Sequence, residues 1–249
     1  MNQYREEQRW TEARLDSCFK TLRLVVISDP HYGNPYHSPK HLKRSLEFVE
    51  KNDDVFAILA GDLCESVVKT SKGEIFNQVG SPRQQRDWLI DEALPPIKKK
   101  IIGMCTGNHE KRILKRAFEA ELPSQIIKSV NEIFQYPKSW SQSECVVANT
   151  KFPFMVTHGD KRGISGSNLK SNPLLFGISV AYGHFHSCPS ICHVETATQR
   201  LWGMHLGTCG IDKESYCFEY GAGSKFVPQN GCAVVLGDGT TPILIPQPD

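Results

Sequence analysis

The sequence lacks the features that mark secreted or membrane proteins. Its first fifteen residues, MNQYREEQRWTEARL, contain neither an apolar core nor a small-residue cleavage site, so we expect no secretory signal. The nine cysteines, an odd number, are scattered without a CxxC pair, which argues against a disulfide framework. No long apolar run suggests a membrane span. We therefore expect a reducing, cytoplasmic location and no membrane partner.

The charge balance is nearly even. Lysine and arginine number 29 and the acidic residues 27, for a net charge of +2, so bulk electrostatics give no argument for nucleic-acid binding. Hydrophobic residues at 39% and charged residues at 22% are typical of globular proteins, and we expect one domain over residues 1–249. Local basic clusters occur at Lys98–Lys100, at Lys111, Arg112, Lys115 and Arg116, and at Lys161 and Arg162. The first of these is typical of a solvated face or a helix end.

Five short apolar segments each end in a polar residue that is able to bind metal. Their β-branched residues and their lengths predict buried strands. They cover residues 22–28, 55–60, 99–107, 152–157 and 175–183. Helices are expected at 41–52, 83–94, 113–122 and 126–134, and an added amphipathic helix at residues 1–20. These elements predict a mixed α/β fold, with a layered β-sandwich flanked by helices.

The candidate metal ligands follow these segments directly. A buried strand fixes the backbone while the loop after it exposes the side chain, so strand ends are suitable places for a site. Oxygen and imidazole ligands together suit Mn, Fe or Zn better than an ion that prefers oxygen alone. We expect Asp29, His31 and His186 to hold one ion, Asn108, His158 and His184 to hold the other, and Asp62 to bridge both.

Five blocks of sequence resemble the calcineurin-like metallophosphoesterases. They read SDPHYG (28–33), GDLCE (61–65), GNHE (107–110), THGD (157–160) and GHFH (183–186), in the family's order. The resemblance implies a four-layer αββα fold and two divalent ions, with Mn expected first and Fe, Zn, Ni or Mg as alternatives. It also implies that a hydroxide bridging the ions attacks the phosphorus of a phosphate ester. Residues 207–239 are similar to the tail of bacteriophage-encoded members.

The resemblance also implies roles for residues beside the ligands. His109 matches the family's non-ligand histidine, which would stabilise the transition state or protonate the leaving group, and Asp62 is the other expected catalytic residue. Arg112 and Lys161 are candidates for contacting the substrate phosphate, because a cation there would neutralise its nonbridging oxygens. Capping of a helix or exposure to solvent would explain both cations equally well.

Other neighbours of the blocks have more than one interpretation. Glu110 and Asp160 are candidates for orienting the imidazole rings. Tyr32, Tyr36 and Phe185 would stack on nucleobases or simply pack against the domain.

Several histidines lie outside this pattern, and we interpret them as structural. They are His37, His41, His193 and His205. One rival metal site, a zinc knuckle, has suitable spacing but would leave the other four blocks unexplained. Its ligands would be His184, His186, Cys188, Cys192 and His193.

The substrate is less well defined than the reaction. The family includes nucleases, cyclic-nucleotide phosphodiesterases, nucleotide pyrophosphatases and protein phosphatases. The second block lacks the GDxxDRG form of serine/threonine phosphatases, and GDL with GHFH is similar to repair nucleases and small phosphodiesterases. We expect a phosphodiesterase that acts on DNA or RNA, or on a nucleotide. The alternatives are a phosphomonoesterase or protein phosphatase, and a non-catalytic scaffold that the metals stabilise.

Overall fold

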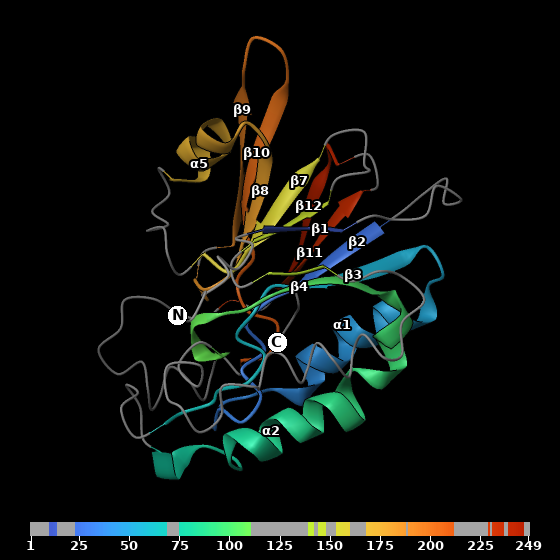
Figure 1. Cartoon of the computed structure of the whole chain (residues 1–249), viewed down its shortest axis with the longest axis vertical. Coiled ribbons are helices and arrows are strands. Elements are labelled where there is room, and N and C mark those ends of the chain that lie inside the picture. The colour runs from blue at the N-terminus through green and yellow to red at the C-terminus, as the bar shows by residue number, and fades with distance from the viewer. Residues whose placement is uncertain are drawn as a thin grey trace, which may run out of the picture.

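The computed structural model describes most of the chain, and the two mixed β-sheets in it lie face to face (Figure 1). The described residues are 10–13, 23–68, 75–110, 139–141, 144–147, 153–159, 168–187, 189–211, 229, 231–236 and 239–246. Two of the expected helices, 113–122 and 126–134, therefore lie outside the described residues.

Among the described residues, each sheet contains six strands. Sheet I has the order β1 (Trp10–Ala13), β6 (Glu144–Val147), β7 (Phe154–Thr157), β8 (Ser179–Tyr182), β10 (Arg200–His205) and β9 (Ser190–Glu195). Sheet II has the order β12 (Pro242–Pro246), β11 (Gly231–Leu236), β2 (Arg23–Ile27), β3 (Val55–Leu59), β4 (Ile101–Cys105) and β5 (Ser139–Ser141). The strands β2, β3 and β4 run parallel, as do β7 and β8, so each set delivers its carboxyl ends to one edge of its sheet.

Helical elements cover the outer faces of both sheets. On sheet II lie α1 (Pro39–Lys51), α2 (Pro82–Trp88), a π-helical turn (Leu89–Ala93) and a 3-10 turn (Pro95–Lys100), and a further 3-10 turn spans Ile75–Asn77. On sheet I, α5 (Asn168–Phe176) packs against β8, β9 and β10 (Figure 1). No helix in the part of the chain that the structure describes is long and apolar enough to cross a membrane.

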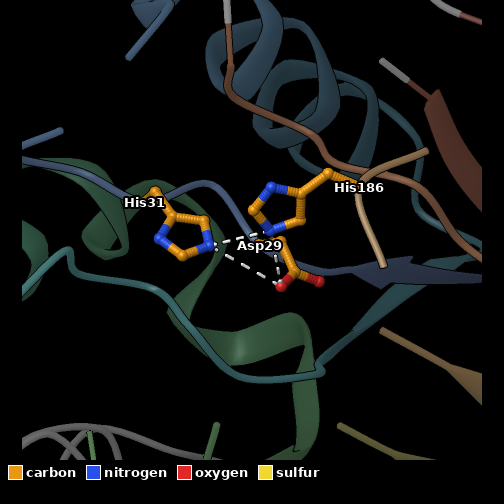
Figure 2. A group of neighbouring side chains, drawn as sticks. All are labelled: Asp29, His31 and His186. Atoms are coloured by element: carbon orange, nitrogen blue, oxygen red, sulfur yellow. Dashed lines mark hydrogen bonds and ion pairs between the residues drawn. The ribbon is translucent and has the colours of Figure 1, made fainter. Parts of the chain in front are cut away.

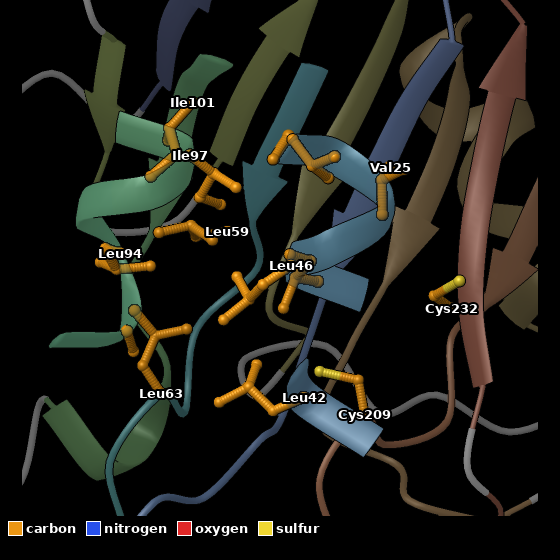
Figure 3. Packing of buried hydrophobic residues seen from close by; sticks show 14 of the residues in the cluster. Val25, Leu42, Leu46, Leu59, Leu63, Leu94, Ile97, Ile101, Cys209 and Cys232 are labelled. Carbon is orange, nitrogen blue, oxygen red and sulfur yellow. The ribbon is translucent and has the colours of Figure 1, made fainter. Parts of the chain in front are cut away.

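Side chains that alternate between the two faces of each strand form three hydrophobic clusters. One lies between sheet II and its helices, one between the two sheets, and one between sheet I and α5. In β2, Leu24 and Val26 face sheet I, while Val25 packs against the helices, because successive side chains of a strand point to opposite faces. Figure 3 shows the helix-side cluster, which contains Val25 of β2 and Leu46 of α1. A third cluster joins sheet I to α5 through Leu169. The predicted four-layer αββα architecture is confirmed.

Two local expectations were wrong. A helix was expected over residues 1–20, but residues 10–13 form the edge strand β1, which is parallel to β6. Pairing with β6 satisfies backbone groups along that edge, which outweighs a weak helical periodicity. The predicted strand at 175–183 is also shorter, because α5 continues to Phe176 and β8 begins only at Ser179.

The basic cluster Lys98–Lys100 forms the last turn of the 3-10 segment Pro95–Lys100. This agrees with the helix end that was one of the two interpretations of its sequence. Lys100 Nζ donates to the carbonyl oxygens of Val49 and Asn52, at 2.9 and 2.7 Å. These carbonyls end α1, where the unpaired carbonyls and the helix dipole favour a cation. Lys100 therefore stabilises the end of α1.

The core between the sheets is expected to be the main source of stability. Ile58 is completely buried there, so Ile58→Ala should lower the free energy of unfolding by about 2–5 kcal/mol through lost burial and a residual cavity. Urea unfolding followed by circular dichroism measures this. Leu175→Ala is the control, because Leu175 is 72% exposed on α5, and its effect should stay within about 0.5 kcal/mol. Equal effects of the two substitutions would contradict the assignment of the core.

Candidate metal centre

The structure brings all seven candidate ligands together at one end of the sandwich. Sheet II supplies its share from the loops after β2, β3 and β4, and sheet I from the loops after β7 and β8. The seven residues are Asp29, His31, Asp62, Asn108, His158, His184 and His186. Residues far apart in sequence meet here because parallel strands place their carboxyl ends at the same edge.

The first group consists of Asp29, His31 and His186 (Figure 2). The two Nε2 atoms of the histidines lie 3.0 Å apart. Asp29 Oδ1 is 3.3 Å from His186 Nε2 and 3.7 Å from His31 Nε2. Three donor atoms thus converge on one point between these side chains, and this is the set expected to hold one ion.

The second group consists of Asp62, His158 and His184, with Asn108 beside it. His158 Nε2 lies 3.2 Å from Asp62 Oδ2 and 3.0 Å from Asn108 Oδ1. Asp62 Oδ2 also lies 3.7 Å from His31 Nε2, so one carboxylate oxygen faces both groups. This is the position that a bridging ligand requires.

These donor sets fit divalent metal ions. Neighbouring ligands around an ion with bonds of about 2.0–2.2 Å lie roughly 3.0–3.5 Å apart, which is close to the separations observed in both groups. Asp29, Asp62 and His158 are also almost fully buried, and converging lone pairs in such a place need a cation between them. Imidazole and carboxylate donors together favour Mn, Fe or Zn.

The backbone is strained at the ligands. Among the described residues, five other than glycine have a left-handed φ, and four of them are Asp29, His31, Asp62 and His184, at 53, 47, 50 and 72°. Such conformations are uncommon for residues with a side chain and persist only where surrounding contacts hold them. The sharp turns after the strands therefore aim these side chains inward at a conformational cost.

Hydrogen bonds on the far side of three of the imidazole rings set their orientation. His158 Nδ1 donates to the Ala60 carbonyl at 2.9 Å, and His31 Nδ1 donates to Glu65 Oε2 at 2.9 Å. Because both acceptors lack a proton, each ring uses Nδ1 as the donor and directs Nε2 at the site. His109 Nδ1 donates to the backbone carbonyl of Glu65 at 2.5 Å, and its Nε2 lies 3.8 Å from Asp62 Oδ2.

Glu65 was missed by the sequence reasoning. Its carboxylate accepts from both His31 and Asn34, and the hydrogen bond from His31 with the charges of His31 and His109 outweighs burial and lowers the pKa of Glu65 to about 2. Its place three residues after Asp62 in the second block was the available signal.

Glu110 has a different role from the expected one. Its carboxylate accepts from the backbone amides of Gly107, Asp62 and Leu63 at 2.7–2.9 Å, and not from an imidazole. It thereby ties the second block to the third. The other candidate for orienting the rings, Asp160, lies outside the described residues.

Gln85 on α2 was also missed. Its side chain is completely buried, accepts from the amide of Ser66 at 2.9 Å and donates to the carbonyl of Val79 at 3.1 Å. A Cβ at Gly33 would lie 2.2 Å from Gln85 Nε2, so only glycine leaves room for this contact. Gln85 lies in none of the blocks, and no sequence pattern pointed to it.

The site is strongly polarised without metal. Burial favours the neutral carboxylic acid, but the neighbouring histidines outweigh it and hold the pKa of Asp29 well below its usual value. Burial likewise favours the neutral ring of His158, yet Asp62 and Asp29 raise its pKa to about 9. Protons on His31 and His158, whose pKa values are raised, therefore offset the carboxylates, and metal binding would have to replace these protons.

The remaining candidates are two cations and three aromatic residues. Arg112 and Lys161 lie outside the described residues. Tyr32 stacks on Trp88 with ring centroids 3.6 Å apart, and Phe185 stacks on His205, so these rings pack within the protein. Tyr36 is buried as well. The aromatic residues thus lend no support to base stacking.

The histidines expected to be structural have structural contacts or positions. His37 Nδ1 donates to the Pro30 carbonyl at 2.8 Å, His41 is buried in α1, and His193 pairs with β10. Among the described residues, His184 and His186 group with carboxylates, whereas Cys192 and His193 join no metal-capable group. Cys188 lies outside the described residues, and the zinc knuckle gains no support.

An αββα sandwich with a candidate two-metal site defines the general class, and comparison with known proteins defines the family. The model for calcineurin-like phosphoesterases matches residues 22–239, so the chain belongs to this family. Similar solved structures include a Vps29 mutant from Entamoeba histolytica, at 12% identity and TM-score 0.43, over 91% of this chain and 100% of that chain. Another is Yfce, a phosphoesterase from E. coli, at 14% identity and TM-score 0.43, over 90% and 99%. Among curated proteins, none matches the chain.

Metal affinity should rise with pH. His158 holds a proton below pH about 9 in the metal-free protein, so apparent affinity should fall by about tenfold for each pH unit below that value. Calorimetric titration with Mn²⁺ at about pH 6, 7 and 8, in two buffers of different ionisation enthalpy, measures both the affinity and the protons released. Affinity that is independent of pH, with no proton release, would contradict this picture.

Proposed function

We propose that this protein is a binuclear metal-dependent phosphodiesterase, with a phosphodiester in DNA or RNA as its first substrate and a nucleotide as its second. The observation that carries the proposal is the set of donor atoms around the Asp62 carboxylate. Its Oδ2 lies 3.2 Å from His158 Nε2, 3.7 Å from His31 Nε2 and 3.8 Å from His109 Nε2. Native Mn, a cytoplasmic location and kinship with bacteriophage members belong to the same proposal.

The proposed ligands divide the work between two ions. Asp29, His31 and His186 would hold one and Asn108, His158 and His184 the other, with Asp62 shared. Bound there, two divalent ions would polarise the phosphoryl group, lower the pKa of a water and stabilise both the entering and the leaving oxygen. The chain supplies a rigid, largely buried frame, so the donors need little rearrangement when the substrate binds.

His109 is the proposed general acid. The Glu65 carbonyl accepts from its Nδ1, which leaves Nε2 facing the site and 9% of the residue exposed. A proton on that Nε2 would pass to the leaving oxygen as the bond to phosphorus breaks. Asp62 Oδ2 lies 3.8 Å from Nε2, and Glu65 Oε1 lies 3.8 Å from Nδ1.

The charges around the site favour a diester over a monoester. Within the described part of the chain, no lysine or arginine is a hydrogen-bond or ion-pair partner of the candidate ligands, and residue 66 is a serine where the GDxxDRG form has arginine. A diester carries one negative charge and a monoester close to two at neutral pH, so the serine in place of that arginine favours the diester.

Loss of His109 should slow turnover without removing metal. His109→Ala should lower kcat by about 100-fold or more, because the leaving oxygen would lose its proton donor. Steady-state kinetics and elemental analysis measure both quantities. His193→Ala, at an exposed histidine of β9, is the matched control and should leave both unchanged. Unchanged kcat in His109→Ala would refute the role, and loss of one ion would make His109 a ligand.

Substrate preference can be read from two chromogenic esters. With Mn²⁺ present, the protein should hydrolyse bis-p-nitrophenyl phosphate with a higher kcat/KM than p-nitrophenyl phosphate. Asp62→Asn, which removes the shared carboxylate, should abolish both activities and controls for contaminating phosphatases. Turnover of the monoester alone would contradict the diester preference.

A panel of natural substrates then ranks the remaining alternatives. Single-stranded DNA, duplex DNA, RNA, cyclic nucleotides and phosphopeptides cover the reactions known in the family. Cleavage of phosphopeptides alone would make the protein a phosphatase. Two bound ions with no turnover on any ester would make it a scaffold.

A further inference from the structure

Every polar atom of Asp29 has a partner inside the protein, and the partners of Oδ1 are histidines of the metal group. Its amide donates to the Gly61 carbonyl at 3.1 Å. Its Oδ2 accepts from the Ser28 hydroxyl and from the amide of His184. Its carbonyl oxygen accepts from the Thr208 hydroxyl at 2.6 Å. Only Oδ1 is directed at His31 and His186.

Thr208 belongs to a short segment after β10 that contacts the loop after β2, which carries Asp29 and His31. We call residues 206–211 the anchor segment. Cys209 donates its amide to the Ser28 carbonyl at 3.0 Å, and Ser38 donates to the Gly210 carbonyl at 2.7 Å. A Cβ at Gly210 would lie 2.5 Å from the Pro30 carbonyl oxygen, so the two segments are in close contact. The anchor segment therefore holds the loop on both sides of Asp29.

The Thr208 hydroxyl gives the anchor segment a side-chain hydrogen bond to Asp29, in addition to the backbone contacts. Thr208 is completely buried and also accepts from the amide of Gly210 at 3.3 Å, which fixes the direction of its own donor. The Asp29 backbone is left-handed, a conformation that a residue with a side chain keeps only under external restraint. A hydrogen bond to the carbonyl of the strained residue restrains the peptide that determines where its carboxylate points.

We propose that Thr208 is a positioning residue for metal binding: its hydroxyl holds the Asp29 carbonyl so that Oδ1 is aimed at the nitrogens of His31 and His186. The inference rests on the proposed metal site. Thr208 touches neither metal nor substrate and acts through Asp29. Residues that orient a ligand in this way typically change metal affinity by roughly 10- to 100-fold when they are lost.

The test compares variants that keep or remove the hydroxyl. Thr208→Val keeps the branched shape and removes the donor, whereas Thr208→Ser keeps the donor. Titration of the metal-free full-length protein with Co²⁺, followed by visible absorption and calorimetry, reports affinity and coordination for each ion. Thr208→Val should weaken the ion held by Asp29, His31 and His186 by roughly 10- to 100-fold and alter its absorption bands, and Thr208→Ser should restore both.

The matched control is Thr196→Val. Thr196 Oγ1 donates to the Gln199 carbonyl at 2.7 Å and accepts from the Gln199 amide, the same pattern as Thr208, but in the β9–β10 turn. This control should leave both ions unchanged. The proposal is overturned if Thr208→Val binds both ions as the wild type does, or if Thr208→Ser loses as much affinity as Thr208→Val.

Folding and function are separated by two further comparisons. If Thr208→Val does not fold, the test uses Thr208→Ala in its place, because this variant lacks the same hydroxyl. If neither folds while Thr208→Ser does, the hydroxyl is a structural requirement and the positioning role is rejected. If the wild type binds two ions but hydrolyses no ester, the proposed phosphodiesterase function fails, and the affinity comparison still decides the role of Thr208.

Discussion

The arrangement of this protein depends on the burial of two carboxylates, Asp29 and Asp62, between two sheets. An ionised carboxylate removed from water is stable only where cations and hydrogen-bond donors surround it. Here imidazole rings and backbone amides from both sheets supply them. The sheets must therefore close with the ends of β2 and β3 opposite those of β7 and β8, which is the same closure that buries the apolar core between them.

The site is held by contacts behind the ligands as much as by the ligands themselves. Glu65 and Ala60 fix two imidazoles, Glu110 accepts from the backbone of the second and third blocks, and Thr208 holds Asp29. These contacts offset the strain of the left-handed turns and leave the inward-facing donor atoms available. A preorganised donor set of this kind favours an ion over the protons that replace it in the metal-free protein.

Much of the fold and of the candidate site could be predicted because the evidence for them is local. Alternating or continuous apolar runs gave the strands that end at Asp29, Asp62 and Asn108, and the chemistry of the residues after them indicated metal. The edge strand at residues 10–13 was not predictable, since its partner β6 lies more than a hundred residues away in sequence and its own periodicity is weak. Pairing of that kind is decided by tertiary context.

By itself the sequence determined the residues that could bind metal, their order along the chain and the strands that deliver them, because those properties depend on short-range pattern and side-chain chemistry. Only the tertiary structure decided how the site is held. Gln85, which carries no motif, supports the loops at Gly33 and Ser66, and Thr208 reaches Asp29 across a separation of 179 residues. Such contacts follow from where the strands end in space, which no local pattern encodes.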